Sequence, residues 1–306
     1  MKNYTLMIGL LAVLLICGTG CGRKKVSIDD LPPDPAVCAN FSYDENHPWA
    51  HVKEMAQLGC LKKLHEWEKS FSNYASLTDA DYIKLSAAII THNTEEIKRL
   101  LSAGLKLDDT TDNQLVYFLP LAISYGNTDA VKALLDDKRN VKNLLQNNAY
   151  FAIGTWMSPF IVRESMQSEN SEQAAIEYIN ILVKNGFDVN TRFTTTHDGC
   201  THTKSVLWSL PKACGKQQIT RELENLGYQV SQQDKDAALF FAAMLQTTYG
   251  SEPKRRNVAI AKELLNEGAN PYALWQSCAS QNTYQAVQEK GSPEMKELFK
   301  MLGAKN

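Results

Sequence analysis

A short apolar pattern recurs along this 306-residue chain and restricts what it can fold into. Two adjacent apolar residues are followed by two other residues and then by a glycine, as in "IKRLLSAG", which ends at Gly104. Ile97, Leu100 and Leu101 would share one face of a helix, and a glycine just after such a run supplies the positive φ of a helix C-cap. Further copies, some of them looser, close at Gly186, Gly227, Gly268 and Gly303, and "VKALLDDK" has Lys138 where the glycine would stand.

A second apolar segment precedes these runs and repeats with them. Leu85, Ala88 and Ile89 match residues 119, 122 and 123 at an offset of 34 residues, and Asn93 matches Asn127 at the same offset. The pattern predicts a unit of helix, tight turn, second helix and loop. Units of this kind bury their apolar faces by stacking, which predicts a helical solenoid.

The segments "AISYGNTDAVKALL" and "NGFDVN" resemble ankyrin repeats. The spacing between closing glycines varies, so the predicted fold is an all-α ankyrin-repeat solenoid with degenerate repeats and loop insertions over residues 79–306. Residues 38–78 are predicted to form a helical N-terminal cap. A tetratricopeptide array has a similar period, but it lacks the Gly-x-Asp-x-Asn ending, which favours the ankyrin reading.

The N-terminus is typical of a secretory signal. Lys2 precedes an apolar run from Leu6 to Ile16, which is too short for a membrane span. Residues 18–21, "GTGC", resemble the lipobox of bacterial lipoproteins. This resemblance implies a signal peptide over residues 1–20 and a lipid on Cys21, with Cys17 as the alternative acceptor. Gly22 implies the outer membrane, facing the periplasm, and prolines predict an extended tether over residues 21–37.

An oxidising periplasm favours disulfides. Spacing along the chain suggests two pairs, Cys38–Cys60 and Cys200–Cys214. The segment "THDGCTHTK" also holds His197 and His202, which with the cysteines allow a zinc site. Because of the compartment, the disulfide is favoured over the metal, and we expect no metal and no other cofactor.

Charge and motifs narrow the functional class. The chain has 32 Lys and Arg residues against 34 Asp and Glu residues, so no basic field predicts nucleic-acid binding. The sequence shows no Gly-rich phosphate loop, no G-x-S-x-G and no H-E-x-x-H. The pattern therefore favours a binding module over an enzyme.

Ankyrin lipoproteins of this architecture resemble immunity partners of type VI secretion effectors, above all of secreted phospholipases. The resemblance implies a toxin encoded nearby as the protein partner; the alternative is a periplasmic scaffold or envelope-stress lipoprotein with an endogenous partner. Contacts are expected where the chain departs from the repeat. The candidate contact residues are Trp156, Phe160, Arg163, Arg192, Phe193, His197 and Asp198. Tyr272 and Trp275 are expected mainly to pack between repeats, although such aromatic residues also make binding hot spots.

Overall fold

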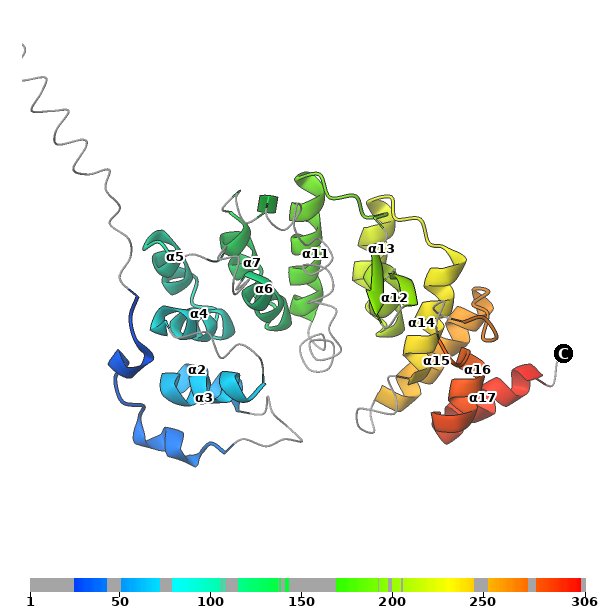
Figure 1. The fold of residues 1–306 in the computed structure, drawn as a ribbon, viewed down its shortest axis with the longest axis horizontal. Helices are drawn as coiled ribbons and strands as arrows, with labels where there is room; N and C mark the ends of the chain where they lie inside the picture. Colours follow the sequence, from blue (N-terminus) through cyan, green and yellow to red (C-terminus); the bar gives the residue numbers. More distant parts are fainter. Residues whose placement is uncertain are drawn as a thin grey trace, which may run out of the picture. The chain divides into compact units, whose positions relative to one another are not determined.

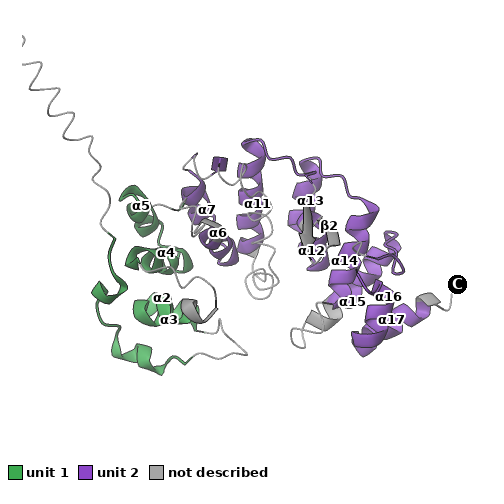
Figure 2. Cartoon of the chain, viewed as in Figure 1, with its two compact units in different colours: residues 1–107 green, residues 108–306 purple. Residues whose placement is uncertain are grey.

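The fold comes from a computed structural model. It describes residues 25–42, 51–71, 79–105, 107, 115–136, 138, 141–142, 169–191, 193–197, 200–204, 206–244, 253–274 and 279–303. The chain divides into two compact units, residues 1–107 and residues 108–306 (Figure 2). The division falls after Leu107 and not at the predicted start of the repeats at residue 79, because α4 packs against α2 and α3.

In its described residues, unit 1 holds two short 3₁₀ helices and four α-helices (Figure 1). The elements are η1 (Ile28–Asp30), η2 (Ala36–Asn40), α2 (Val52–Leu58), α3 (Leu61–Phe71), α4 (Ala80–Ile90) and α5 (Thr94–Ser102). The predicted helical cap thus contains α2 and α3 in its described part. Apolar side chains of α4 and α5, among them Ile83, Leu85 and Ile97, are fully buried and form the core of this unit.

The predicted extended tether over residues 21–37 is wrong from residue 25 onward, because residues 25–42 pack against the rest of unit 1. We call these residues the strap. The N–H of Ala80 donates to the carbonyl of Val26 at 2.8 Å, and Leu31 is buried. The carboxylate of Asp34 accepts the backbone N–H groups of Lys62 and Lys63, at 2.9 and 2.7 Å, at the start of α3. Proline excludes an α-helix here, but it leaves short 3₁₀ turns open.

The predicted Cys38–Cys60 disulfide is confirmed. It closes between η2 and the residue before α3, with the two Cα atoms 5.7 Å apart. Both cysteines are buried. The disulfide and the Asp34 cap therefore fasten the strap to α3 at neighbouring points.

Unit 2 is helical except for one two-stranded hairpin among its described residues (Figure 1). Its elements are α6 (Leu115–Ser124), α7 (Thr128–Leu135), α11 (Glu169–Lys184), β1 (Phe193–His197), β2 (Cys200–Lys204), α12 (Val206–Ala213), α13 (Gln217–Asn225), α14 (Gln232–Met244), α15 (Pro253–Asn266), α16 (Thr283–Lys290) and α17 (Pro293–Gly303). The helical prediction is confirmed; the predicted loop insertion around residues 193–204 is instead an antiparallel hairpin.

The same turn joins the two helices of a pair in three places. After α4, α6 and α12, three consecutive N–H groups donate back to the helix that has just ended. The middle residue has a positive φ: 57° at His92, 64° at Gly126 and 68° at Gly215. The side chains of Asn93 and Asn127 then cap the second helix by accepting the N–H of residues 96 and 130. The repeat seen in the sequence is therefore also a repeat of backbone hydrogen bonds.

A second turn, centred on a glycine, ends the second helices α5, α11 and α13 and also ends α15. Gly104, Gly186, Gly227 and Gly268 have φ values between 87° and 97°. At each of them the N–H of the following residue donates to a carbonyl five positions back, and that following residue is buried. The predicted glycine C-caps are confirmed at these four positions, whereas Gly303 lies within the bounds of α17.

In unit 2, the first helices of successive pairs lie side by side, and so do the second helices. The second helices α7, α11 and α13 contact one another in that order, and the first helices α12, α14 and α16 do the same. Fully buried residues such as Val131, Tyr178 and Leu223 lie along the first of these rows. Each helix pair covers the apolar face of the next, as a stacked repeat requires.

Candidate partner-binding surface

Most of the contact residues predicted from the sequence lie outside the described part of the chain. These are Trp156, Phe160, Arg163, Arg192 and Asp198. The lipidation candidate Cys21 also lies outside the described residues. Phe193 and His197 are the first and last residues of β1, where they pair with Lys204 and Cys200. The backbone of the hairpin is described, while the side chains of residues 193–204 are not.

The predicted Cys200–Cys214 disulfide stays a prediction, because the side chain of Cys200 is not described. Cys214 follows α12 and is half-buried, and its N–H donates to the carbonyl of Leu210. Cys200 opens β2 at the turn of the hairpin.

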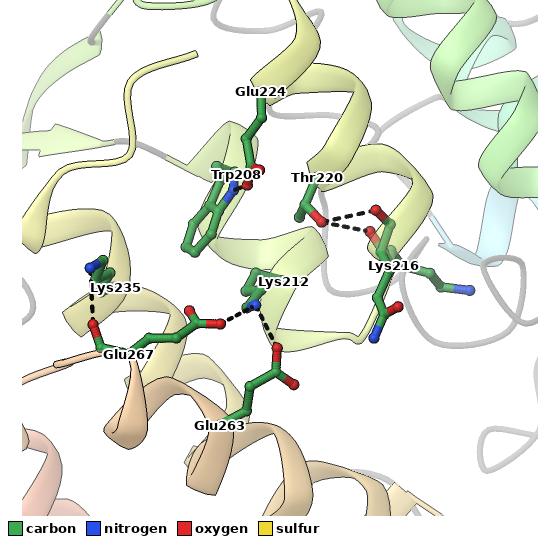
Figure 3. A network of polar contacts seen from close by, with 9 residues as sticks. Trp208, Lys212, Lys216, Thr220, Glu224, Lys235, Glu263 and Glu267 are labelled. Carbon is green, nitrogen blue, oxygen red and sulfur yellow. Dashed lines mark hydrogen bonds and ion pairs between the residues drawn. The ribbon is translucent and has the colours of Figure 1, made fainter. Parts of the chain in front are cut away.

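A network of polar contacts joins α12 to its neighbours (Figure 3). The ammonium of Lys212 donates to Glu263 at 2.7 Å and to Glu267 at 2.8 Å, both on or just after α15. The Lys212 side chain is only 15% exposed. Burial works against its charge, but the hydrogen bonds to the two carboxylates outweigh it and raise the pKa of Lys212. The hydrogen bond from Lys212 lowers the pKa of Glu263.

The same network extends from α12 to α13 and from α14 to α15 (Figure 3). The indole N–H of Trp208 donates to Glu224 at 2.9 Å, and the Lys212 ammonium lies 5.7 Å from the centre of the Trp208 ring. Lys235 on α14 donates to the carbonyl of Glu267 at 2.9 Å. Three helix-to-helix junctions therefore share neighbouring residues, which fixes the relative positions of these helices.

α11 makes similar contacts with the helices on either side of it. Lys132 on α7 lies 3.7 Å from Glu177, and Asn180 donates to Glu222 on α13 at 2.9 Å. Lys216 forms an ion pair of 3.6 Å with Glu172, and both side chains are nearly buried. A buried pair is costly to break, because the remaining charge would lose both water and partner.

The loops that leave the second helices are tied to each other. The Asn190 side chain donates to the carbonyl of Gly227 at 2.9 Å and accepts the N–H of Gln229 at 2.8 Å. One pair further on, Asp236 on α14 accepts the N–H of Asn270 at 2.7 Å, which ties the loop after α15 to a helix. These bonds hold the loops in fixed positions, so any surface that they form is preorganised.

The last of these loops presents apolar side chains to solvent. Tyr272 is 44% exposed and Leu274 is 50% exposed. The Tyr272 ring lies 5.2 Å from that of Tyr284, and the Tyr272 N–H donates to the side chain of Asn270 at 2.9 Å. Tyr272 was expected mainly to pack between repeats, and it does contact Tyr284, but nearly half of its surface stays open. Trp275 lies outside the described residues.

Neither a protein-family model nor a curated protein sequence matches this chain significantly. Among the residues whose side chains are described, no group of three or more His, Cys, Asp or Glu residues is placed to hold a metal ion. Within the described parts, every helix is too short or too polar to span a bilayer.

Proposed function

We propose that the protein is a membrane-anchored, ankyrin-type binding module of the periplasm, which binds and inhibits a toxin delivered by type VI secretion. The phospholipase class is the favoured target. In this proposal the protein performs no catalysis, and a lipid on Cys21 holds it at the outer membrane. The proposal rests on the resemblance of the repeats, the signal sequence and the Gly-Cys junction to ankyrin immunity lipoproteins.

One structural observation supports it most: successive helix pairs repeat the same turn bonds, and their loops are fastened to a neighbouring loop or helix. A stoichiometric inhibitor gains affinity when its contact surface is already ordered, because little conformational freedom is lost on binding. The bonds of Asn190 and Asp236 supply such order in the loops, and the Lys212 network supplies it in the helices beneath.

Tyr272 and Leu274 extend the candidate contact surface beyond the residues predicted from the sequence. Exposed tyrosines that are held in one orientation are common binding hot spots. The tilted ring contact with Tyr284 holds the Tyr272 side chain in this way, and the hydrogen bond from its N–H to Asn270 holds the backbone beneath it. The contacts predicted at Trp156 and Phe160 remain predictions and are tested by the same assay.

The test is to express each enzyme encoded next to this gene in the periplasm, with and without the protein. We expect one neighbour to be toxic alone and harmless with the protein, and to form a one-to-one complex with it. If no neighbour binds and cells lacking the gene survive attack by their siblings, the immunity proposal is wrong and a scaffold role takes its place.

Substitutions then locate the surface. Tyr272→Ala should weaken the complex about 30-fold, which corresponds to ~2 kcal/mol, if Tyr272 is a hot spot. Tyr272→Phe keeps the ring and its contact with Tyr284, so it serves as the matched control and should bind within a few-fold of the wild type. Equal binding by all three proteins would remove Tyr272 from the interface.

A further inference from the structure

The strap exposes a run of apolar residues to solvent. Within residues 32–39 every exposed residue is apolar: Pro32, Pro33, Pro35, Ala36, Val37 and Ala39. We call these six residues the apolar strip. The other two residues of this stretch are engaged with the rest of unit 1, since Asp34 accepts N–H groups at the start of α3 and Cys38 is bonded to Cys60. The strip therefore carries no charge of its own.

Leu58, at the end of α2, enlarges this apolar surface. Among the described residues of unit 1, the large apolar residues that are exposed are Val37, at 42%, and Leu58, at 40%. Val37 is next to Cys38, and Leu58 is two positions before Cys60, whose Cα atom lies 5.7 Å from that of Cys38. With about 3.8 Å between consecutive Cα atoms, the Cα atoms of Val37 and Leu58 are at most about 17 Å apart. Apolar residues that gather in this way mark a contact surface more often than single exposed ones do.

The strap begins close to the proposed lipid. Lys25 is the last of three consecutive basic residues, which begin two positions after Cys21. From there the strap runs along one side of unit 1 (Figure 1). It passes the start of α4, where the Ala80 N–H donates to Val26, and reaches the start of α3. The end of the strap that is nearest to the anchor and the apolar strip therefore lie on the same side of unit 1.

We propose that the apolar strip and Leu58 rest on the lipid surface that carries the anchor, and that this contact fixes the orientation of unit 1 toward the bilayer. The inference rests on the lipid at Cys21 in the proposed function, and it adds how the anchored protein is oriented. A lipid surface is the favoured occupant because the short link from Cys21 keeps it within reach of the strap. A contact that is weak by itself is then sufficient, since tethering gives a high effective concentration.

The charges of the strap indicate which part of it makes this contact. Basic residues beside an anchor are attracted to anionic headgroups, but the exposed Asp29 and Asp30 follow them and offset two of the three charges. The apolar strip therefore has to supply most of the contact, and vesicles of uncharged lipid are sufficient to detect it.

The test uses the full-length lipidated protein in phosphatidylcholine vesicles whose acyl chains carry bromine, which quenches tryptophan on contact. Val37→Trp places a tryptophan in the apolar strip. Lys98→Trp is the control: it places one at an exposed position of α5, at the opposite end of unit 1 from η2 (Figure 1). Compared with the wild type, the tryptophan added at position 37 should lose emission in brominated vesicles, whereas the one added at position 98 should not.

A second substitution in the Val37→Trp protein tests the contribution of Leu58. Leu58→Asp should lower the ratio of contacting to free strips about fivefold, because the exposed part of one leucine no longer leaves water. Gln57→Asp adds the same charge at the neighbouring exposed position without removing apolar surface, so it should lower the ratio much less. Equal effects of the two substitutions would show that apolar contact is not the cause.

The outcomes separate this inference from the proposed function. If vesicle-bound protein loses no more emission at position 37 than at position 98, the proposal is overturned and a protein partner becomes the candidate occupant of the strip. If the protein does not sediment with the vesicles, the lipid anchor and this inference fail together. No toxin is present in the assay, so a quenched strip in a protein that inhibits no neighbour would refute the proposed inhibition alone.

Discussion

Replacing Lys212 by methionine tests how much the polar network contributes to the stability of unit 2. Methionine keeps an apolar stem of similar length, so the substitution mainly removes the ammonium and its hydrogen bonds to Glu263 and Glu267. Lys212 is 15% exposed, whereas Glu263 and Glu267 are 47% and 36% exposed. The carboxylates can therefore regain water when the lysine is lost.

The expected loss lies between two limits. Hydrogen bonds to charged groups contribute about 1.5–3 kcal/mol each when well enclosed, and exposed ion pairs contribute about 0–1 kcal/mol. With a nearly buried cation and half-exposed anions, we expect Lys212→Met to cost about 2 kcal/mol. For a unit of this size that loss lowers the melting temperature by about 4–8 °C.

Lys290→Met is the matched control. Lys290 lies 3.7 Å from Glu289, but both side chains are more than half exposed, so its loss should lower stability far less than the loss of Lys212. Urea unfolding followed by tryptophan fluorescence measures both variants, because the buried Trp208 lies beside Lys212. If Lys212→Met and Lys290→Met lower stability equally, the argument from burial is wrong.

The stability difference between the wild type and Lys212→Met should depend on pH in a defined way. The pKa of Glu263 is lowered below its ordinary value of 4.5, so its contribution is present above pH 4.5 and disappears as the pH falls through the folded value. The pKa of Lys212 is raised above 10.5, so its contribution is complete below that pH and disappears as the pH rises further. The stability difference between wild type and Lys212→Met should therefore be constant near neutral pH and shrink in acid.

Three more substitutions test other parts of the fold. Cys38→Ser opens a disulfide between cysteines 22 residues apart and should lower the free energy of unfolding in urea by about 3 kcal/mol. If the variant is still less stable than the wild type by the same amount when both proteins are reduced, the loss does not come from the disulfide. Gly126→Ala should destabilise more than Gly186→Ala: both have positive φ, but only at Gly126 would a Cβ meet Asn170, at 2.6 Å. Cys21→Ala should abolish labelling by a fatty-acid analogue and release the protein from membranes; undiminished labelling would move the acceptor elsewhere.

The helix pairs and their glycine caps could be predicted because each repeat carries its own local signal. A glycine after two apolar residues indicates a positive φ wherever it occurs, and four such caps are present. The turn between the paired helices is less visible, since His92 takes the conformation that Gly126 and Gly215 have in later pairs. A histidine there gives no turn signal of its own.

The hairpin has a local signal in the sequence, whereas the strap has none. The Asp198-Gly199 pair, flanked by threonines in "TTTHDGCTHT", is typical of a two-residue hairpin turn more than of an irregular loop insertion. The prolines of the strap favour an extended tether, but Asp34 accepts backbone N–H groups at the start of α3. That contact joins residues 28 positions apart, so no local sequence pattern predicts it.

The Lys212 network could not be predicted from the sequence either, because its contacts also join residues far apart in the chain. Lys212 meets Glu263 and Glu267 across 51 and 55 residues, and the meeting depends on how successive helix pairs stack. The composition shows many lysines and glutamates, but not which of them share a buried site.

The strap also sets the distance at which unit 1 can stand from a bilayer. If Cys21 carries the lipid, only residues 22–24 separate it from Lys25, the first residue of the strap, and an extended link from Cys21 to Lys25 reaches about 14 Å. A folded domain of 100 residues is wider than 25 Å, since its radius of gyration is about 13 Å. Under the proposed function, an enzyme of that size could therefore not lie between the strap and the lipid.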